Sequence, residues 1–570
     1  MSREIHSWIT ELILRVSNSH ARGPLDHLIS RPSSIIVISS SLRRRQSSLR
    51  SEILLTAMNH GCDWSRKALN TPPQRSFCSQ CRATTADRCG TTGQVLINLL
   101  PDDALVEIFD FYVHQIATRW KKDGWITLVH VCQKWRDIVF RSPRRLNLEL
   151  VCTARTPVRR TLFVWPPLPV VIEQLSDSTR DEDNILAALE HNDRIRKITF
   201  WDVSTVQEKV LAAMQEPFPA LKYLDLRSSD GTPPITPNPI LGGSAPHLRV
   251  LTLDSISIRG LPNLLVSATD LVVLNLYSIP HSAYISPEKL VTCLSSSRRL
   301  RFLDLGFKSP LSRPKREDRR PPPKTRSVLP ALTSFVFKGA SEYLEDLVAR
   351  IDAPLLHSLD TTFFHQLIFD TPHLTQFVSR LLALNVHNQA QARVVFSGMQ
   401  ISVVFLQGKR GVFGMRISCA QSDWQLSSLA QLCTSSFPQV LIPAVEHLYL
   451  VDNRDFQPLW LDDMENSQWL EILRPFTALK NLYLSKGLAP CVAPSLQELV
   501  GGRVEESLPA LQGLCLEELH PLVPIEEAFE KFVAARRLSN RPMAISHWER
   551  DYPSWSFGPP ETYRWPVLFD

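Results

Sequence analysis

A six-residue pattern, Leu-x-x-Leu-x-Leu or a close variant, recurs ten times between residues 195 and 516 and constrains the fold more than any other feature. The first seven copies start 26, 27, 23, 29, 32 and 24 residues apart. A unit of that length can form a short strand and a return segment, but it can bury its apolar side only against its neighbours. We therefore expect a stack of repeats. The ten copies are Ile195–Phe200, Leu221–Leu226, Leu248–Leu253, Leu271–Leu276, Leu300–Leu305, Leu332–Phe337, Leu356–Thr361, Val445–Leu450, Leu479–Leu484 and Leu511–Leu516.

The pattern and its period are similar to those of leucine-rich repeats, whose units span about 20–29 residues. The resemblance implies an α/β fold in which residues 148–520 form an irregular leucine-rich-repeat-like solenoid. The asparagine that usually follows the strand in such repeats is absent, with Ser228 and Gly306 at comparable places, so the units are degenerate. The segment Thr371–Pro443 interrupts the repeats: its alternating apolar residues predict strands, and Trp424–Cys433 predicts a short helix.

Within each repeat, successive side chains of the strand point to opposite sides. In the copy that starts at Leu221, the alternation directs Leu224 and Leu226 inward. The outward positions of the array mix aromatic and polar groups, which suits a protein ligand and is equally typical of a solvated strand face. The outward residues that we take as candidate ligand-binding residues are Tyr223, Asp225, Asn275, Phe302, Asp304, Tyr449 and Tyr483.

Two amphipathic helices are predicted before the repeats, within residues 96–147. Pro101 suits the first position of a helix, and Asp102 and Asp103 complement the positive end of its dipole. Apolar residues then recur at helical spacing in two stripes, the second of which belongs to a helix that ends at Ser142-Pro143. The first stripe is Leu105, Ile108, Phe109, Tyr112 and Ile116, and the second is Leu128, Val131, Cys132, Trp135 and Val139.

The order of these residues resembles the F-box, which runs Leu-Pro, then Ile-Phe, then Leu-x-x-Val-Cys and, shortly after, Trp. Gln133 replaces a basic residue of the family, and Ile116–Gly124 is longer than the connection in its shortest members. The resemblance implies that the segment binds the Skp-type adaptor of a cullin–RING ubiquitin ligase. A pair of ordinary core helices is the alternative, because apolar residues at helical spacing are usually core. The residues that the resemblance assigns to adaptor binding are Leu100, Pro101, Leu105, Ile108, Phe109, Leu128, Val131, Cys132 and Trp135.

No catalytic motif accompanies these features: the sequence has no Gly-x-Ser-x-Gly, P-loop, His-Glu-x-x-His or dinucleotide fingerprint. We therefore expect a non-catalytic, substrate-recruiting F-box subunit of a ubiquitin ligase, without cofactor or metal. Its expected partners are the Skp-type adaptor, the cullin scaffold and a protein substrate, with no membrane and no specific nucleic acid. The alternative is a leucine-rich-repeat scaffold outside any ligase, in which the helical segment only caps the solenoid.

The N-terminal extension, residues 1–95, is rich in arginine and serine. It is interpreted first as a disordered extension, with a targeting peptide and a basic patch as alternatives. Thiols and a histidine within it have the types and spacing of zinc ligands, but a single Cys-x-x-Cys favours free thiols. These residues are His60, Cys62, Cys78, Cys81 and Cys89.

Two further segments lie outside the repeat pattern. Residues 308–328 are strongly basic and are predicted to form a solvated loop between repeats, with a nuclear signal as the alternative. In the C-terminal part, residues 521–570, Ile525–Ile545 begins as an amphipathic helix that caps the last coil. The aromatic tail His547–Asp570 either packs back on the domain or docks a partner, and we favour packing.

The net charge of +6 is modest for 570 residues and does not indicate a dedicated nucleic-acid binder. No apolar run approaches the ~20 residues that cross a bilayer. We expect a cytoplasmic and/or nuclear protein.

Overall fold

The computed structural model divides the chain into two compact units, Met1–Leu105 and Val106–Asp570. The predicted N-terminal extension with its candidate zinc ligands, the centre of the basic segment 308–328 (residues 313, 315–322 and 324) and the tail beyond residue 550 lie outside the described residues. The described residues are 100–117, 124–153, 156–174, 182–201, 208–228, 239–258, 260–312, 314, 323, 325–364, 371–383, 390–397, 400–407, 410–418, 424–431, 433, 442–452, 466–498, 508–517 and 525–550.

Three helices form the segment before the repeats: α3 (Asp102–Ala117), α4 (Gly124–Val129) and α5 (Gln133–Arg141). The predicted start of α3 is confirmed, because the helix begins directly after Pro101 with two aspartates in its first turn. The predicted end of α5 is confirmed as well, since Ser142 is its C-terminal cap.

The second predicted helix is wrong as a single element, because the chain leaves the helical conformation between α4 and α5. The backbone N–H of His130 donates to the carbonyl of Thr127, and that of Val131 donates to the carbonyl of Leu128. Each bond reaches back three residues, as in a 3₁₀ turn and not as in an α-helix. Cys132 is extended, with a φ of −158°. As a result Val131, which the helical stripe placed on the apolar face, is 49% exposed.

Sixteen strands of the described part form one sheet in the order β1-β2-β3-β4-β5-β6-β7-β9-β11-β14-β13-β12-β15-β16-β17-β18. The strands are β1 (Leu150–Cys152), β2 (Val170–Gln174), β3 (Ile195–Phe200), β4 (Tyr223–Arg227), β5 (Val250–Asp254), β6 (Val273–Ile279), β7 (Phe302–Phe307), β9 (Ser334–Gly339), β11 (Ser358–Phe364), β12 (Ala390–Ser397), β13 (Gln400–Gln407), β14 (Arg410–Ser418), β15 (Val445–Asp452), β16 (Asn481–Leu484), β17 (Gly513–Glu517) and β18 (Ala544–Trp548). A separate pair is β8 (Ser327–Val328) and β10 (Ile351–Asp352).

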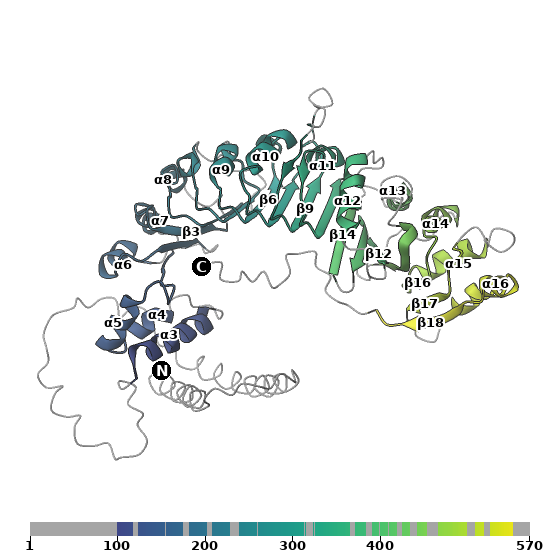
Figure 1. Cartoon of the computed structure of the whole chain (residues 1–570), viewed down its shortest axis with the longest axis horizontal. Helices are drawn as coiled ribbons and strands as arrows, with labels where there is room; N and C mark the ends of the chain where they lie inside the picture. Colours follow the sequence, from purple (N-terminus) through teal and green to yellow (C-terminus); the bar gives the residue numbers. More distant parts are fainter. Residues whose placement is uncertain are drawn as a thin grey trace, which may run out of the picture. The chain divides into compact units, whose positions relative to one another are not determined.

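Helices connect most of the strands, and they run along one side of the sheet (Figure 1). Apolar residues of α7 to α16 belong to the same core as the inward residues of the strands. The helices are α6 (Val158–Val164), α7 (Glu182–Leu189), α8 (Glu208–Ala213), α9 (Leu261–Ser267), α10 (Pro287–Leu294), α11 (Ser341–Val348), α12 (Pro372–Ala383), α13 (Trp424–Gln431), α14 (Asn466–Leu473), α15 (Ala489–Gln497) and α16 (Ile525–Leu538).

All ten copies of the sequence pattern contribute a strand, so the predicted stack of repeats is confirmed, and its strands form a long, mainly parallel sheet. Corresponding leucines of successive repeats are paired in register from β4 to β7. Each of these leucines is completely buried, which is why no single repeat is stable without its neighbours. One such row is Leu224, Leu251, Leu274 and Leu303.

The interruption between residues 371 and 443 forms a three-stranded meander inside the sheet. Its strands β12, β13 and β14 and the helix α13 confirm the predicted elements. The meander enters the sheet in reverse order: β14 pairs in parallel with β11, and β12 pairs in parallel with β15. Only β13, antiparallel to both neighbours, breaks the parallel ladder, so the sheet continues through the interruption.

The sheet also extends beyond residue 520, where the sequence placed the end of the solenoid. The helix α16 buries Phe529 and Phe532 in the core as predicted, but it is followed by β18, which pairs in parallel with β17. The buried Arg536 of α16 donates to the carbonyl oxygens of Leu508 and Leu511, at 3.2 and 2.6 Å. Residues 525–548 therefore form one more unit of the sheet.

Because the leucine rows hold the repeats together, Leu303→Ala is expected to destabilise the chain by about 2–5 kcal/mol. The matched control is Val266→Ala on α9, whose side chain is 50% exposed and whose truncation is expected to change stability by less than about 0.5 kcal/mol. Urea denaturation followed by circular dichroism measures both changes. Equal midpoints for the two variants would contradict a core built from these rows.

Candidate binding surface

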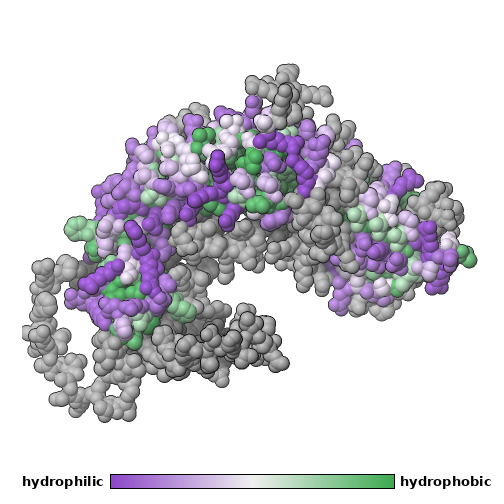
Figure 2. All heavy atoms as spheres, viewed as in Figure 1, coloured by the Kyte–Doolittle hydropathy of each residue, from purple (hydrophilic) through white to green (hydrophobic). Residues whose placement is uncertain are grey.

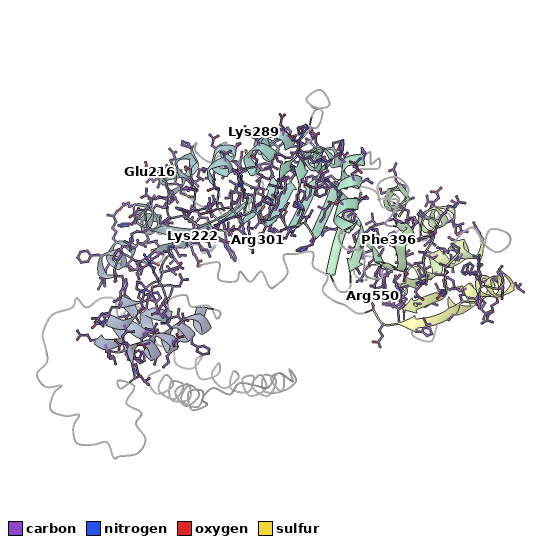
Figure 3. The ribbon with its side chains drawn as sticks, in the orientation of Figure 1. Glu216, Lys222, Lys289, Arg301, Phe396 and Arg550 are labelled. Atoms are coloured by element: carbon purple, nitrogen blue, oxygen red, sulfur yellow. The ribbon has the colours of Figure 1, made fainter. Side chains whose placement is uncertain are left out.

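The sheet has one face covered by helices α7 to α16 and one opposite face, here called the strand face. Figure 3 shows Lys222 and Arg301 at the strand side, whereas Glu216 and Lys289 lie at the helix side. In Figure 2 hydrophilic residues predominate over the helices, with small hydrophobic patches between them. The residues that the alternation directs away from the leucine rows project from the strand face.

An apolar row runs across the strand face from β4 to β7. Val250, Val273 and Phe302 form a cluster separate from the main core, and Tyr223 packs against it. Their in-register pairing places these side chains next to one another along the sheet. The three members of the cluster are at most 5% exposed.

A polar row lies beside the apolar one, and its first carboxylate is held by its own strand. Arg227 binds both oxygens of Asp225, through Nε at 2.9 Å and Nη2 at 3.0 Å, and the Tyr223 hydroxyl donates to Oδ2 at 3.3 Å. Asp225 is 3% exposed, so its carboxylate is buried and not solvated. Burial, and next the Asp225 charge, raise the pKa of Tyr223.

The polar row continues through Asn275 and Asp304, which are paired in register and are also buried. Asn275 donates from Nδ2 to the Thr252 hydroxyl at 3.0 Å. Burial, and next the nearby charge of Asp360, raise the pKa of Asp304 to about 7, although a hydrogen bond from Tyr277 and the charge of Arg416 lower it. A buried carboxylate with this pKa is only partly ionised near neutral pH.

Asp360 on β11 completes the row and joins the repeats to the meander. It forms an ion pair with Arg416 of β14, the neighbouring strand, and it is 2% exposed. Burial raises the pKa of Asp360 to about 6 although Arg416 opposes the shift.

A basic row lies where the strands begin. Lys222 and Arg249 directly precede β4 and β5, and Arg196 occupies the equivalent position near the start of β3. The backbone N–H of Lys222 donates to the carbonyl of Arg196, and that of Arg249 donates to the carbonyl of Lys222. Burial lowers the pKa of Lys222, and the charges of Arg196 and Arg249 lower it further. The strand face is thus bordered by positive charge at this edge.

At the other end of the sheet the strand face carries an aromatic cluster. The rings of Tyr449 and Tyr483 are stacked, with centroids 4.1 Å apart, and Trp548 lies edge-on to both at 5.9 and 5.8 Å. The Tyr483 hydroxyl and the Asn481 amide are each 3.4 Å from Nδ1 of His447. Burial lowers the pKa of His447.

The candidate residues of the strand face therefore fall into two groups. Those on β4 to β7 are adjacent, and Tyr449 and Tyr483 are adjacent, but five strands separate the groups. Sequence reasoning missed the partners of these residues. Arg227 and Tyr277 occupy the next outward position of their strands and are found by continuing the alternation, whereas Trp548 follows no repeat copy. The missed residues are Arg227, Tyr277, Asp360, Arg416 and Trp548.

The candidate adaptor-binding residues are mostly buried within the helical segment. Phe109 of α3 and Trp135 of α5 are in contact, with ring centroids 4.7 Å apart. Pro101 and Val131 are exposed, and Leu100 and Cys132 are half-buried. The buried candidates are Leu105, Ile108, Phe109, Leu128 and Trp135, each at most 6% exposed.

The described residues hold no group of three or more side chains arranged to bind a metal ion.

A groove of about 540 Å³ beside α12 is lined by Arg326, Asp352, His373 and Arg380, among others. Arg380 is 3.4 Å from Asp352, and Arg326 donates to the carbonyl of Ala349. None of the described helices combines the length and the apolar character that crossing a membrane requires.

No family model matches the chain, and no curated protein matches it. The crystal structure of the leucine-rich repeat-containing protein LegL7 from Legionella pneumophila aligns with 61% of this chain and 99% of its own, at 15% identity and a TM-score of 0.26. The fold described above rests on the strand ladder and not on this likeness.

The raised pKa of Asp304 predicts how stability depends on pH. The folded chain binds the proton more tightly than an ordinary aspartate with a pKa of 3.8. The free energy of unfolding therefore decreases as the pH rises from about 4 to about 7, by at most about 1.4 kcal/mol per pH unit from this group. Asp304→Asn removes this contribution and is expected to flatten the profile, measured by urea denaturation between pH 5 and 8. Identical slopes for the two chains would show that Asp304 titrates normally.

Proposed function

We propose that the chain is a substrate-recruiting F-box subunit of a cullin–RING ubiquitin ligase, in which the helical segment binds the Skp-type adaptor and the strand face binds a protein substrate. The observation that carries the proposal is the contact of Phe109 with Trp135, because it joins the two halves of the F-box-like pattern. Phe109 and Trp135 are 26 residues apart in the sequence.

The burial of the pattern divides its residues into two roles. Ile108, Phe109 and Trp135 are at most 6% exposed, so they hold α3 against α5 and act on the adaptor through the shape of the segment. Side chains that reach the surface make the contact itself. Val131 is 49% exposed and Phe111 is 44% exposed, and apolar side chains at such positions are typical anchors of helix-in-groove interfaces.

The strand face has the chemistry of a surface that recognises protein. Among the described residues, no hydrogen-bond donor reaches the buried Oδ1 atoms of Asn275 and Asp360 or the buried Oγ1 of Thr199. Buried acceptors without donors are costly, by about 1–3 kcal/mol each, and a partner that supplies N–H donors relieves that cost. Together with the carboxylates of Asp304 and Asp360, they favour a substrate segment that carries arginine or lysine.

A leucine-rich-repeat scaffold outside any ligase is the second candidate. The burial of Ile108, Phe109, Leu128 and Trp135 favours it, because a helical cap of the repeats would also bury these residues. Adaptor binding distinguishes the two candidates, since only the first requires it.

The test is binding of a purified Skp-type adaptor to the full chain, measured by titration and by co-elution in size-exclusion chromatography. Val131→Asp and Phe111→Asp place a carboxylate on the exposed apolar positions and are expected to weaken binding on the order of tenfold or more, which is about 1.4 kcal/mol. Phe163→Asp is the matched control, because Phe163 on α6 is 91% exposed and lies outside the pattern.

Failure of the wild-type chain to bind the adaptor would contradict the ligase proposal and leave the scaffold. Equal binding by Val131→Asp, Phe111→Asp and Phe163→Asp would contradict the assignment of the exposed apolar positions. Thermal unfolding of each variant identifies any loss of binding that comes from misfolding.

A further inference from the structure

Cations recur at the second residue of the six-residue repeat pattern. Four of the first seven repeats carry arginine or lysine there, and none of the seven carries an acid. Backbone hydrogen bonds of 2.8 Å continue the basic row from Arg249 through Val272 to Arg301 at the start of β7. Figure 3 shows Lys222 and Arg301 on the strand side. The four cations therefore lie in register along one edge of the strand face, from β3 to β7. They are Arg196, Lys222, Arg249 and Arg301.

Most of these cations are not neutralised by the described part of the chain. Arg196, Lys222 and Arg301 form no ion pair with any other described residue. The nearby carboxylate of Glu173 on β2 has a different partner, because it lies 3.1 Å from Lys197. The edge therefore offers positive charge to a partner.

The cations also act on one another, because neighbouring strands are only about 4.8 Å apart. Burial, and next the charges of Arg196 and Arg249, lower the pKa of Lys222, although Glu149 opposes the shift. Like charges at this spacing repel, so an anion that lies along the edge removes part of the repulsion.

The apolar row lies directly beside this edge, because each of its members is the next residue of its strand. Side chains of an extended segment point alternately to two sides. A segment with acidic side chains on one side and apolar side chains on the other can therefore contact both rows at once. The carboxylates of Asp225 and Asp304 lie two residues beyond the apolar row, and they favour the orientation in which the acidic side faces the cations. From β3 to β7 there are four strand spacings, about 19 Å, which an extended segment of about six residues spans.

This edge suits an acidic protein segment better than a nucleic acid. Surfaces that bind single-stranded nucleic acid combine cations with a series of aromatic side chains on which successive bases stack. Here Val250 and Val273 separate Tyr223 from Phe302, so no such series is present in the apolar row. A chain of phosphates would match the cations alone, whereas alternating acidic and apolar side chains match both rows.

We propose that the four cations bind an extended acidic segment of a partner protein, whose apolar side chains lie on the apolar row. This inference deepens the proposed function, because it names the kind of sequence that the strand face recruits. It rests on that function only for the strand face and not for the adaptor. Binding of the segment requires no adaptor, so the two proposals can fail separately.

A labelled peptide of about eight residues that alternates glutamate and leucine tests the proposal with the full chain. Fluorescence anisotropy is expected to show binding that weakens about tenfold between about 0.05 and about 0.5 M salt, because salt screens exposed charges. The control peptide has glutamine in place of every glutamate and is expected to bind about tenfold more weakly at low salt. Equal binding of the two peptides, or no binding of either, would overturn the proposal. Tighter binding of single-stranded DNA of the same length would also overturn it, since the edge would then prefer a chain of phosphates.

Substitutions in the full chain locate the peptide. Lys222→Gln combined with Arg301→Gln is expected to weaken binding of the glutamate peptide about tenfold. Lys480→Gln is the matched control, because Lys480 occupies the same position of a later repeat but is paired with Glu446 at 2.8 Å. It is expected to leave peptide binding unchanged, and equal effects of the two changes would overturn the proposal.

The same variants separate this inference from the ligase proposal. The double variant is expected to lose the peptide and to bind the adaptor as the unchanged chain does. Binding of the peptide by a chain that fails to bind the adaptor would support the inference and contradict only the ligase proposal. The salt dependence of the unchanged chain needs no substitution, so a misfolded variant does not affect it.

Discussion

The in-register pairing of parallel strands is the constraint on which the rest of the structure depends. A repeat of about 25 residues cannot enclose its own apolar side, so each leucine row is buried only when the strands beside it are aligned residue by residue. Leu224, Leu251, Leu274 and Leu303 show this alignment over four repeats. A slip of one residue in any strand would move its leucines to the strand face.

The same register creates the strand face. Outward residues of neighbouring strands lie side by side, so one row becomes apolar, around Val250 and Phe302, and the next becomes polar, around Asp225 and Asp304. Their proximity also raises the pKa of Asp304, since the Asp360 charge adds to the effect of burial. The meander preserves the arrangement, because Arg416 of β14 pairs with Asp360 of β11.

Local structure was largely predictable from the sequence, and long-range arrangement was not. The ten strands follow from the spacing of leucines, and the start of α3 follows from Pro101 and the two aspartates. The reversed order of β12, β13 and β14 depends on partners far away in the chain, which no local pattern encodes. The break between α4 and α5 was missed because Val131 and Cys132 satisfy helical spacing although their backbone is not helical.

The candidate residues of the binding surface were found by alternation, but their surroundings were not. The alternation placed Asp225 on the outward side, but it did not show that Arg227 and Tyr223 bind its carboxylate. The resemblance assigns nine residues to adaptor binding, and five of them are buried within the helical segment. Burial of this kind depends on residues that are close in space but distant in the sequence, so only the structure shows which candidates are buried.

The central claim is that the sheet strands before the meander, β1 to β7, β9 and β11, and the strands after it, β15 to β18, belong to one continuous sheet that runs through the meander. Hydrogen exchange of the full chain, resolved to individual strands by mass spectrometry, tests it most directly. The account predicts that β14, β13 and β12 exchange as slowly as β11 and β15 on either side, because every one of these strands is paired on both edges. Fast exchange in the three meander strands beside slow exchange in β11 and β15 would contradict it.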